Sequence, residues 1–205
     1  EETPSLIIKK KIRKKIEKLI INAIESIKYK NIGTIEFIVD KKKKIYFMEM
    51  NTRIQVEHTI TEESNNIDIV KNQIYISNEK NKFTKNYYPN LYVIQCRINA
   101  ENSKKKFIPN TGKIKKLNIP NGSGIRIETD ICNGYIVKNE YDSMLMKIIT
   151  KSKKRKNSIK KMKIALNELN IKGIKTTIPI HIKIMNNKEF IKGKFNSKTI
   201  NKIIN

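Results

Sequence analysis

The stretch YFMEMNTRIQVEHTITEE, from Tyr46 to Glu63, joins an apolar segment to a dense run of polar side chains. Its start predicts a β-strand over Ile45–Met50. Six polar or charged residues then fall within ten positions: Glu49, Asn51, Arg53, Gln55, Glu57 and His58. Alternate residues of an extended chain share one face. The pattern therefore predicts a wall of chemically active groups at the end of a strand.

The strand before this run is expected to form a hairpin with Thr34–Val39 through the charged turn Lys41–Lys44. A four-residue turn sets three cross-strand pairs: Asp40 with Ile45, Ile38 with Phe47, and Glu36 with Glu49. The last pair opposes two carboxylates whose Cβ atoms are about 4.5–5.5 Å apart, which is destabilising. Neighbouring Ile38 and Phe47 on the expected face make it partly apolar, and this strengthens the repulsion.

Two arrangements relieve the repulsion between Glu36 and Glu49. One carboxylate holds a proton, or a divalent cation lies between the two. Asn51, one step along the same face, adds a neutral oxygen, and such a ligand set suits Mg²⁺ with phosphate as its remaining partner. The alternative is a half-solvated hairpin face whose carboxylates pair with nearby lysines. The pattern by itself leaves both open.

The alternation continues through Arg53, Gln55 and Glu57 if the chain stays extended. A guanidinium and an amide there could bind a small planar anion, because Arg presents a fork matched to a carboxylate or carbonate. The carboxylate of Glu57 is placed as a general base. His58 points the other way, so we expect a supporting hydrogen bond from it rather than catalysis. The alternative is an exposed amphipathic strand.

The other residues predict a mixture of helices and strands. A helix is expected over residues 5–28, where apolar side chains recur at helical spacing after Pro4, and another over residues 66–78. Turn signals such as PNTGK and PNGSG then separate four short strand candidates: Leu91–Asn99, Gly112–Leu117, Gly124–Glu128 and Ser143–Thr150. Two more helices are expected, at 158–169 and from near Ile178. The class is α+β, with a domain boundary between residues 85 and 86.

The composition excludes some functions. The formal charge is +25, from 44 Lys and Arg against 19 Asp and Glu. The basic runs lack the interleaved aromatic residues that stack on bases, so we expect no nucleic-acid partner, although a Lys-rich binding module is kept as a remote alternative. No apolar run reaches eighteen residues, so no membrane span is expected. Cys96 and Cys132 lack metal or disulfide spacing and are expected to be small buried residues in a reducing compartment.

The polar run also resembles a known family. YFMEMNTRIQVEH is similar to the active-site segment of biotin carboxylases, the ATP-grasp enzymes that carboxylate biotin. Further motifs resemble the same family in order along the chain: TIEFI around Glu36, QCRINAE (Gln95–Glu101), FIPNTGKI (Phe107–Ile114), GSGIRIET (Gly122–Thr129), YDSMLMK (Tyr141–Lys147) and GIKTTIP (Gly173–Pro179). The resemblance implies that residues 1–85 are the C-terminal part of an ATP-grasp domain, with the metal and bicarbonate wall. Residues 86–205 would be the biotin carboxylase C-terminal α/β domain.

The resemblance also implies roles for single residues. One set matches the family's ligands for the two Mg²⁺ or Mn²⁺ ions that bridge the phosphates of ATP: Glu36, Glu49 and Asn51. A second set matches its bicarbonate site: Arg53, Gln55 and the backbone at Val56. Arg53 would also be catalytic, because it offsets charge that develops on the phosphoryl oxygens. Glu57 matches the base that activates bicarbonate, and Arg97 the arginine that stabilises the biotin enolate. Arg126 falls near the family's dimer interface and is expected to be structural.

The implied function is ATP-dependent carboxylation of biotin by bicarbonate through carboxyphosphate. Biotin would be carried on a biotin carboxyl carrier protein, with carboxyltransferase subunits as further partners and a homodimer at full length. EMNTR, INAE and GKFNSKTI favour the subunit of acetyl-CoA carboxylase, which serves fatty-acid synthesis. Thr59, IQCR and PNTGK lean towards pyruvate carboxylase, and propionyl-CoA carboxylase stays open. The expected location is the cytoplasm or an organelle of bacterial origin.

The start of the chain raises a separate expectation. In the family, a glycine-rich ATP lid and a nucleotide-binding lysine precede a segment like EETP, which here is Glu1–Pro4. We therefore expect an N-terminally truncated fragment that is inactive alone. A remnant that only dimerises is an alternative, but every motif residue named above is intact.

Overall fold

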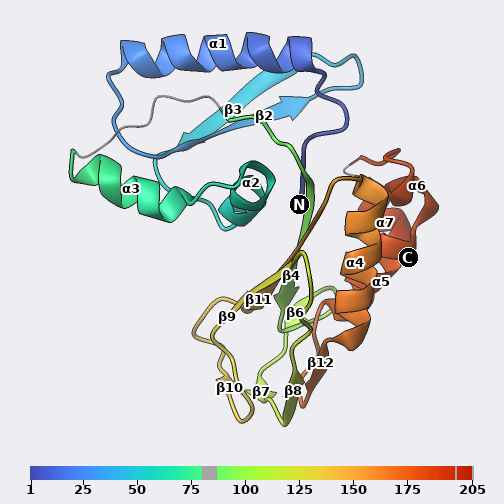
Figure 1. Ribbon diagram of the computed structural model, residues 1–205. Coiled ribbons are helices and arrows are strands. Elements are labelled where there is room, and N and C mark those ends of the chain that lie inside the picture. Colours follow the sequence, from blue (N-terminus) through green and yellow to red (C-terminus); the bar gives the residue numbers. More distant parts are fainter. Residues whose placement is uncertain (80–86, 197, 205) are drawn as a thin grey trace. The chain divides into compact units, whose positions relative to one another are not determined.

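The computed structural model describes residues 1–79, 87–196 and 198–204 of the 205-residue chain (Figure 1). Helices and strands are mixed along it, which confirms the α+β class. The chain divides into two compact units: the first is Pro4–Pro89, and the second is Glu1–Thr3 with Asn90–Asn205. The domain boundary predicted between residues 85 and 86 lies outside the described residues.

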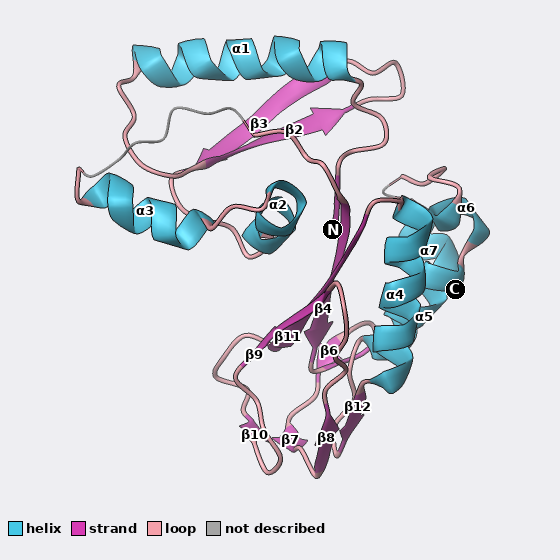
Figure 2. Cartoon of the chain, in the orientation of Figure 1, coloured by secondary structure: helices cyan, strands magenta, loops and turns pink. Residues whose placement is uncertain are grey.

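The described part of the unit Pro4–Pro89 contains one hairpin and the helices around it (Figure 2). Its elements are α1 (Lys10–Ser26), β2 (Thr34–Val39), β3 (Ile45–Asn51), α2 (His58–Asn65) and α3 (Ile69–Ser77). The apolar face of α1 and the hairpin line a common groove, which includes Ile16, Ile35 and Phe37. The predicted helix over residues 5–28 is therefore present, in a shorter form.

The helix expected over residues 66–78 starts later than predicted, and α2 was not predicted. Asn66 ends α2 in the left-handed conformation, with φ 54°. Asp68 then begins α3, because its side chain accepts a hydrogen bond from the backbone N–H of Lys71 at 2.8 Å. These two residues divide the segment into two short helices.

The hairpin register combines a correct pair with two wrong ones. Glu36 lies opposite Glu49, as predicted. The connection is one residue longer than expected, because Asp40 caps the turn by accepting from Lys44 N at 2.8 Å. Closer to the turn the pairs are Val39 with Ile45, Ile38 with Tyr46, and Phe37 with Phe47. The register shifts between Glu36 and Phe37, and this bulge restores the carboxylate pair.

Because of the bulge, the side chains that share the face of Glu36 and Glu49 differ from those predicted. Phe47 packs edge-on against Phe37, with ring centroids 6.3 Å apart. Since Phe37 and Glu36 are adjacent on β2 and point to opposite faces, Phe47 is not on the carboxylate face. The apolar residues opposed there are Ile38 and Tyr46, and both are exposed. The carboxylate pair therefore lies on a wetter face than predicted.

The second unit is built on a four-stranded antiparallel sheet in the order β1-β4-β11-β9. Its strands are β1 (Glu2–Thr3), β4 (Tyr92–Asn99), β11 (Met144–Ser152) and β9 (Ile125–Thr129). The three longer strands match those predicted near the same positions. The helices are α4 (Arg155–Glu168), α5 (Ile178–Asn186), α6 (Lys188–Ile191) and α7 (Thr199–Ile204). The two helices predicted at 158–169 and from near Ile178 are thus confirmed.

Three small two-stranded ladders extend this unit. β5 (Glu101–Asn102) pairs with β6 (Ile108–Pro109), β7 (Gly112–Lys113) with β10 (Ile136–Val137), and β8 (Lys116–Asn118) with β12 (Asn170–Lys172). The strand predicted over Gly112–Leu117 is therefore two short strands. Ile114, which lies between them, is fully buried in the core, and the chain changes its pairing partner there from β10 to β12.

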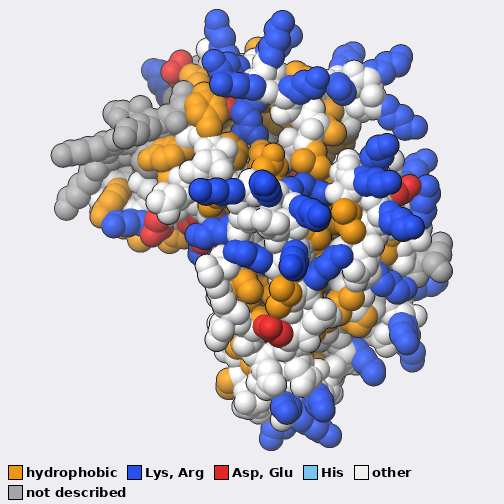
Figure 3. Space-filling view, turned by 45° about the vertical axis from the view of Figure 1, so that its right-hand side comes forward, with side chains coloured by type: hydrophobic (Ala, Val, Ile, Leu, Met, Phe, Trp, Pro, Cys, Tyr) orange, Lys and Arg blue, Asp and Glu red, His pale blue; other side chains and the backbone are white. Residues whose placement is uncertain are grey.

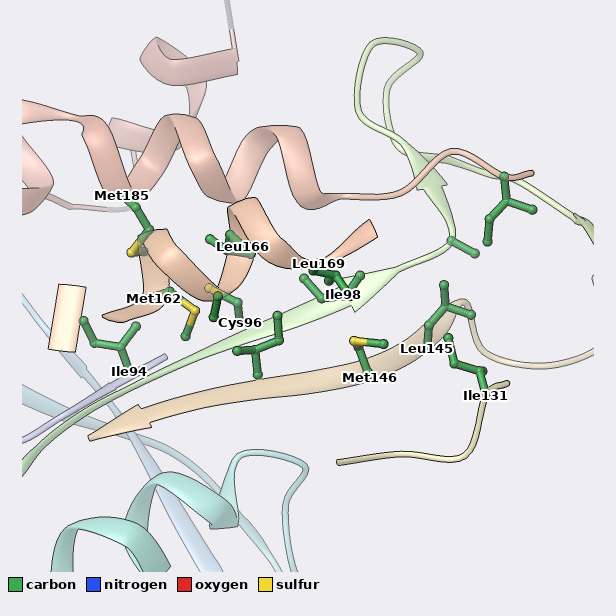
Figure 4. Close-up of a cluster of buried hydrophobic side chains, with 14 of the residues drawn as sticks. Ile94, Cys96, Ile98, Ile131, Leu145, Met146, Met162, Leu166, Leu169 and Met185 are labelled. Carbon is green, nitrogen blue, oxygen red and sulfur yellow. The ribbon is translucent and has the colours of Figure 1, made fainter. Parts of the chain in front are cut away.

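The hydrophobic core lies between the sheet and α4 (Figure 4). Alternate residues of β4, namely Ile94, Cys96 and Ile98, point towards Met162 and Leu166 of α4. Burying one such side chain contributes roughly 1.5–3 kcal/mol. The core thus fixes which face of β4 carries the polar residues Gln95, Arg97 and Asn99.

The two cysteines differ. Cys96 is buried as predicted, and burial raises the pKa of its thiol to about 12. Cys132 is exposed, which corrects the prediction for that residue. It precedes Asn133 and Gly134 in a turn that connects to β10, so the backbone holds it at the surface.

No helix in the described ranges is long and apolar enough to cross a membrane. Lys and Arg side chains are spread over the visible face of the molecule, with polar and apolar groups between them (Figure 3).

Arg155, the first residue of α4, contacts both β1 and α6 of the second unit. Its Nε lies 2.7 Å from Glu2 Oε2, and its two terminal nitrogens donate to the backbone oxygens of Ile191 and Phe190 at 2.9 and 3.0 Å. The guanidinium also lies over the ring of Phe190, 4.9 Å from the centroid. The side chains of Arg155 and Glu2 are only 12% and 15% exposed, so solvent screens the pair weakly.

Replacing Arg155 with Ala is therefore expected to lower the free energy of unfolding by about 3 kcal/mol, because it leaves a nearly buried carboxylate and two carbonyls without their donor. Denaturant titration of the purified chain measures this. The matched control is Lys156→Ala, an exposed cation at the next position of α4. Equal stability of the two variants would contradict the structural role of Arg155.

Candidate active site

The end of the hairpin brings two carboxylates and two amides together. Asn51 Nδ2 lies 3.0 Å from Glu36 Oε1 and 3.1 Å from Glu49 Oε1. Gln55 Nε2 donates to the same Glu36 oxygen at 2.5 Å. The amide N–H groups place positive partial charge between the carboxylates, which offsets their repulsion. The predicted meeting of Glu36, Glu49 and Asn51 is thus observed, with Gln55 as an additional member.

This cluster fits a divalent cation. Rotation of the Asn51 amide by half a turn exchanges its nitrogen and oxygen, and would present three oxygen ligands at one point. Among the described residues there is no group of three or more His, Cys, Asp and Glu that could hold a metal. The two carboxylates would therefore depend on amide and substrate oxygens to complete the shell, as Mg²⁺ commonly does with phosphate.

The polar strip that follows is not an extended wall. β3 ends at Asn51, and the chain turns before α2 begins at His58. The turn closes with a hydrogen bond from His58 N to Gln55 O at 3.1 Å. Because the chain turns and becomes helical from His58 onward, it is not extended over this segment. The prediction that Arg53, Gln55 and Glu57 alternate along one face of a strand is therefore wrong.

The turn nevertheless brings some of these residues back to the hairpin. Gln55 reaches Glu36, as described above, and Arg53 Nη2 lies 3.5 Å from Asn51 Oδ1. Arg53 Nη1 donates to the backbone oxygen of Ile54 at 3.1 Å, and its side chain is exposed. Val56 is half-buried. The guanidinium is therefore exposed beside Asn51 and accessible to an anion.

Glu57 immediately precedes α2, at the N-cap position. It is half-buried and lines a cavity of about 470 Å³ together with Gln55 and His58. His58 Nδ1 lies 2.7 Å from the backbone oxygen of Gln55. Because a carbonyl only accepts, Nδ1 carries the hydrogen, which confirms the expected supporting hydrogen bond. This bond fixes the turn that carries both Gln55 and Glu57.

Arg97 belongs to the other unit, on β4. Its Nε lies 2.7 Å from Glu1 Oε1, and Gln95 Nε2 donates to the second oxygen of the same carboxylate at 3.2 Å. The side chains of Arg97 and Glu1 are 37% and 27% exposed. Both residues line a cavity of about 600 Å³ that also contains His181. No sequence pattern indicated Glu1 as a partner of Arg97, because only the pairing of β1 with β4 brings them together.

Arg126 takes part in a cluster of charges across the sheet. It contacts Glu128 on β9, and Lys147 Nζ on β11 lies 2.6 Å from the other oxygen of Glu128. Partial burial of Glu128 raises its pKa, but hydrogen bonds from Lys147 and Arg126 outweigh this and bring the pKa below its usual value. The structural role expected for Arg126 stays a prediction.

The pKa of His181 is lowered from its ordinary value of 6.5, chiefly by burial. The folded chain therefore favours neutral His181, whereas the unfolded chain takes up a proton near pH 6.5. The stability that this residue contributes is present above pH 6.5 and is lost as the pH falls through the lowered value.

We expect the stability of His181→Gln to depend less on pH below 6.5 than that of the wild type. Thermal unfolding midpoints across this window measure the difference. Parallel curves for the two proteins would contradict the assignment.

Comparison with known protein families identifies the class of protein to which this chain belongs. Residues 1–82 match the family described as carbamoyl-phosphate synthase L chain, ATP binding domain. Residues 95–202 match the biotin carboxylase C-terminal domain. The chain therefore belongs to the biotin carboxylase family, as its motifs predicted.

Individual relatives of known name support the same family. The chain is 41% identical over 201 residues to Biotin carboxylase 1 of Bacillus subtilis, covering 97% of this chain and 45% of the relative. It is 43% identical over 199 residues to one of the pyruvate carboxylase subunits of Methanothermobacter thermautotrophicus, covering 96% and 40%.

One solved structure is the biotin carboxylase domain dimer of the Hydrogenobacter thermophilus 2-oxoglutarate carboxylase, in complex with MgADP, ADP and bicarbonate. It matches with a TM-score of 0.96 at 39% identity, over 100% of this chain and 46% of that one. The chain thus spans somewhat less than half the length of each of these three proteins.

Proposed function

We propose that the protein containing this chain catalyses the ATP-dependent carboxylation of biotin. The observation that carries the proposal is the cluster in which Asn51 bridges the carboxylates of Glu36 and Glu49, while Gln55 donates to Glu36. Two opposed carboxylates with an amide oxygen within reach supply the hard oxygen ligands that Mg²⁺ prefers, and a related domain was solved with MgADP and bicarbonate. Family membership and the intact motifs add to it.

In this proposal the cluster holds the phosphates of ATP. Glu36, Glu49 and Asn51 would ligate two Mg²⁺ or Mn²⁺ ions, which offset the negative charge of the transferring phosphoryl group. The contribution of the chain is to keep both carboxylates at opposed positions of a rigid hairpin. A hairpin sets their separation before substrate arrives, so little reorganisation is needed at the moment of reaction.

The turn after β3 would bind bicarbonate. Arg53, Gln55 and the backbone at Val56 orient the anion, and Glu57 accepts its proton. An oxygen of the deprotonated anion attacks the γ-phosphorus, the bond to the β–γ bridging oxygen breaks, and ADP leaves with carboxyphosphate as the other product. His58 keeps Gln55 and Glu57 in place through its hydrogen bond to the Gln55 carbonyl.

Arg97 would serve the second step. Carboxyphosphate breaks into CO₂ and phosphate, the released phosphate accepts the ureido proton of biotin, and the deprotonated nitrogen then attacks the CO₂ carbon. The guanidinium offsets the negative charge on the enolate oxygen of biotin, a task that suits a permanently charged, planar donor. The contact with Glu1 restrains the Arg97 side chain from the Nε side.

The partners follow from the same proposal. Biotin would arrive on a biotin carboxyl carrier protein, carboxyltransferase subunits would use the product, and the full-length protein would be a homodimer. Acetyl-CoA is our first candidate for the final acceptor, on the motifs EMNTR, INAE and GKFNSKTI. Pyruvate is the second, supported by Thr59 and by the similarity to a pyruvate carboxylase.

The test is ATP cleavage by the intact protein as the cell makes it, measured with bicarbonate, Mg²⁺ and free biotin each added or left out. We expect cleavage to require bicarbonate and Mg²⁺, and ¹⁴C from labelled bicarbonate to appear in carboxybiotin. An ATP cleavage rate that is the same with and without bicarbonate would contradict the proposal. Adding the copurified partner chains with acetyl-CoA or pyruvate then identifies the acceptor by which one takes up the label.

A further inference from the structure

The edge of β4 is shared between a strand and a helix. β1 pairs with its first half, placing Glu2 opposite Ile94, and Gln95 N donates to Glu1 O at 2.9 Å. Thr177, the N-cap residue of α5, pairs with the same edge further along. Thr177 N donates to Asn99 O at 3.0 Å, and Asn99 N donates to Thr177 Oγ1 at 3.0 Å.

Arg97 lies at the junction of these two partners. Its backbone oxygen lies 2.8 Å from His181 Nε2 and accepts a longer bond of 3.3 Å from Thr177 Oγ1. A carbonyl accepts and cannot donate, so Nε2 of His181 must carry the hydrogen. The histidine is half-buried and lies on α5, one turn after Thr177. It therefore holds the main chain of Arg97 while Glu1 holds the side chain.

From this arrangement we infer that His181 is a positioning residue for Arg97. The inference rests on the proposed function, in which Arg97 stabilises the biotin enolate. His181 acts through the main chain of Arg97, whose carbonyl it holds. It sets where the Cα of Arg97 lies, and hence where the guanidinium ends. Small displacements of such a group matter, because a misplacement of about 1 Å can cost as much as 100-fold in rate.

Three substitutions separate this role from general support of the fold. His181→Leu removes the donor but keeps an apolar body of similar size. His181→Asn stays polar, but its amide is too short to reach the Arg97 oxygen. His181→Gln carries an amide nitrogen that can occupy the position of Nε2. The matched control is Lys183→Ala, an exposed residue of the same helix.

The experiment uses the intact protein and compares two rates: carboxylation of free biotin, and the bicarbonate-dependent ATP cleavage that proceeds without biotin. We expect His181→Leu and His181→Asn to lower kcat for biotin carboxylation by about 10- to 100-fold. His181→Gln should recover to within about threefold of the wild type. The biotin-independent cleavage should change by less than about twofold in all three, since Arg97 is not needed for it in the proposed scheme.

The variant Arg97→Lys distinguishes failure of the inference about His181 from failure of the proposed role of Arg97. If His181 acts through Arg97, adding His181→Leu to Arg97→Lys causes no further loss. If Arg97→Lys is impaired but His181→Leu and His181→Asn are not, the inference fails and the proposed function stands. If Arg97→Lys keeps the wild-type rate, the proposed role of Arg97 fails and the inference with it. Equal losses in both reactions for the His181 variants indicate a purely structural residue and overturn the inference.

Discussion

Replacing Glu57 with Gln is expected to reduce bicarbonate-dependent ATP cleavage by about 10²- to 10⁴-fold, the usual contribution of a general base. The amide is nearly the same size as the carboxylate, but it cannot take the proton of bicarbonate. Glu57 precedes α2 and its side chain lines the cavity shared with Gln55 and His58, so the substitution changes the chemistry of that wall while the helix is retained. Steady-state cleavage by the intact protein, with and without bicarbonate, measures the effect.

The control for this variant is Glu25→Gln. Glu25 is an exposed carboxylate near the end of α1, in the same unit, and its loss changes the net charge by the same amount. We expect Glu25→Gln to retain the wild-type rate. If Glu57→Gln retained more than about a tenth of the wild-type activity, Glu57 would not be the base, and Arg53 and Gln55 would have to act on an anion deprotonated elsewhere.

Replacing Arg97 with Lys is expected to lower carboxylation of free biotin by roughly 10²–10³-fold, the typical effect of removing one electrostatic donor to a developing oxyanion. Lysine keeps the positive charge but has neither the planar fork nor the Nε that contacts Glu1 at 2.7 Å. Initial rates with free biotin, at saturating ATP and bicarbonate, give kcat and KM separately. A loss confined to kcat would place the interaction in the transition state.

The control for Arg97 is a second arginine of the same sheet. Arg126→Lys changes a residue that contacts Glu128, outside the proposed reaction. We expect it to alter biotin carboxylation by less than about threefold, because Arg126 is not a donor to the developing oxyanion in the proposed scheme. If both variants lost activity equally, the effect would reflect the sheet as a whole, and the assignment of Arg97 to biotin would be contradicted.

Local chemistry in the sequence was enough to predict most elements. The helical spacing of apolar residues located α1 and α4, and turn residues bounded the strands that became β4, β9 and β11. The boundaries between short helices were less predictable. The break at Asn66 and Asp68 depends on a left-handed residue and a side-chain cap, and these signals are short compared with the apolar pattern around them.

The hairpin shows how a correct contact can follow from partly wrong geometry. The charge pattern predicted that Glu36 and Glu49 would be opposed, and they are. The assumed turn was one residue too short, and a bulge next to Glu36 compensates for that difference. The sequence does not reveal this bulge, because turn length and strand register are set together by packing and by the capping bond of Asp40.

By itself, the sequence determined the family of this protein and the residue types of its candidate site, since motif order and spacing are properties of the chain. Tertiary structure alone decided which groups meet across long separations in the sequence. The pairing of β1 with β4 brings Glu1 to Arg97, and α5 brings His181 to the Arg97 carbonyl across 84 positions of the sequence. Such contacts depend on the long-range packing of a sheet against helices, and no local pattern of residues encodes them.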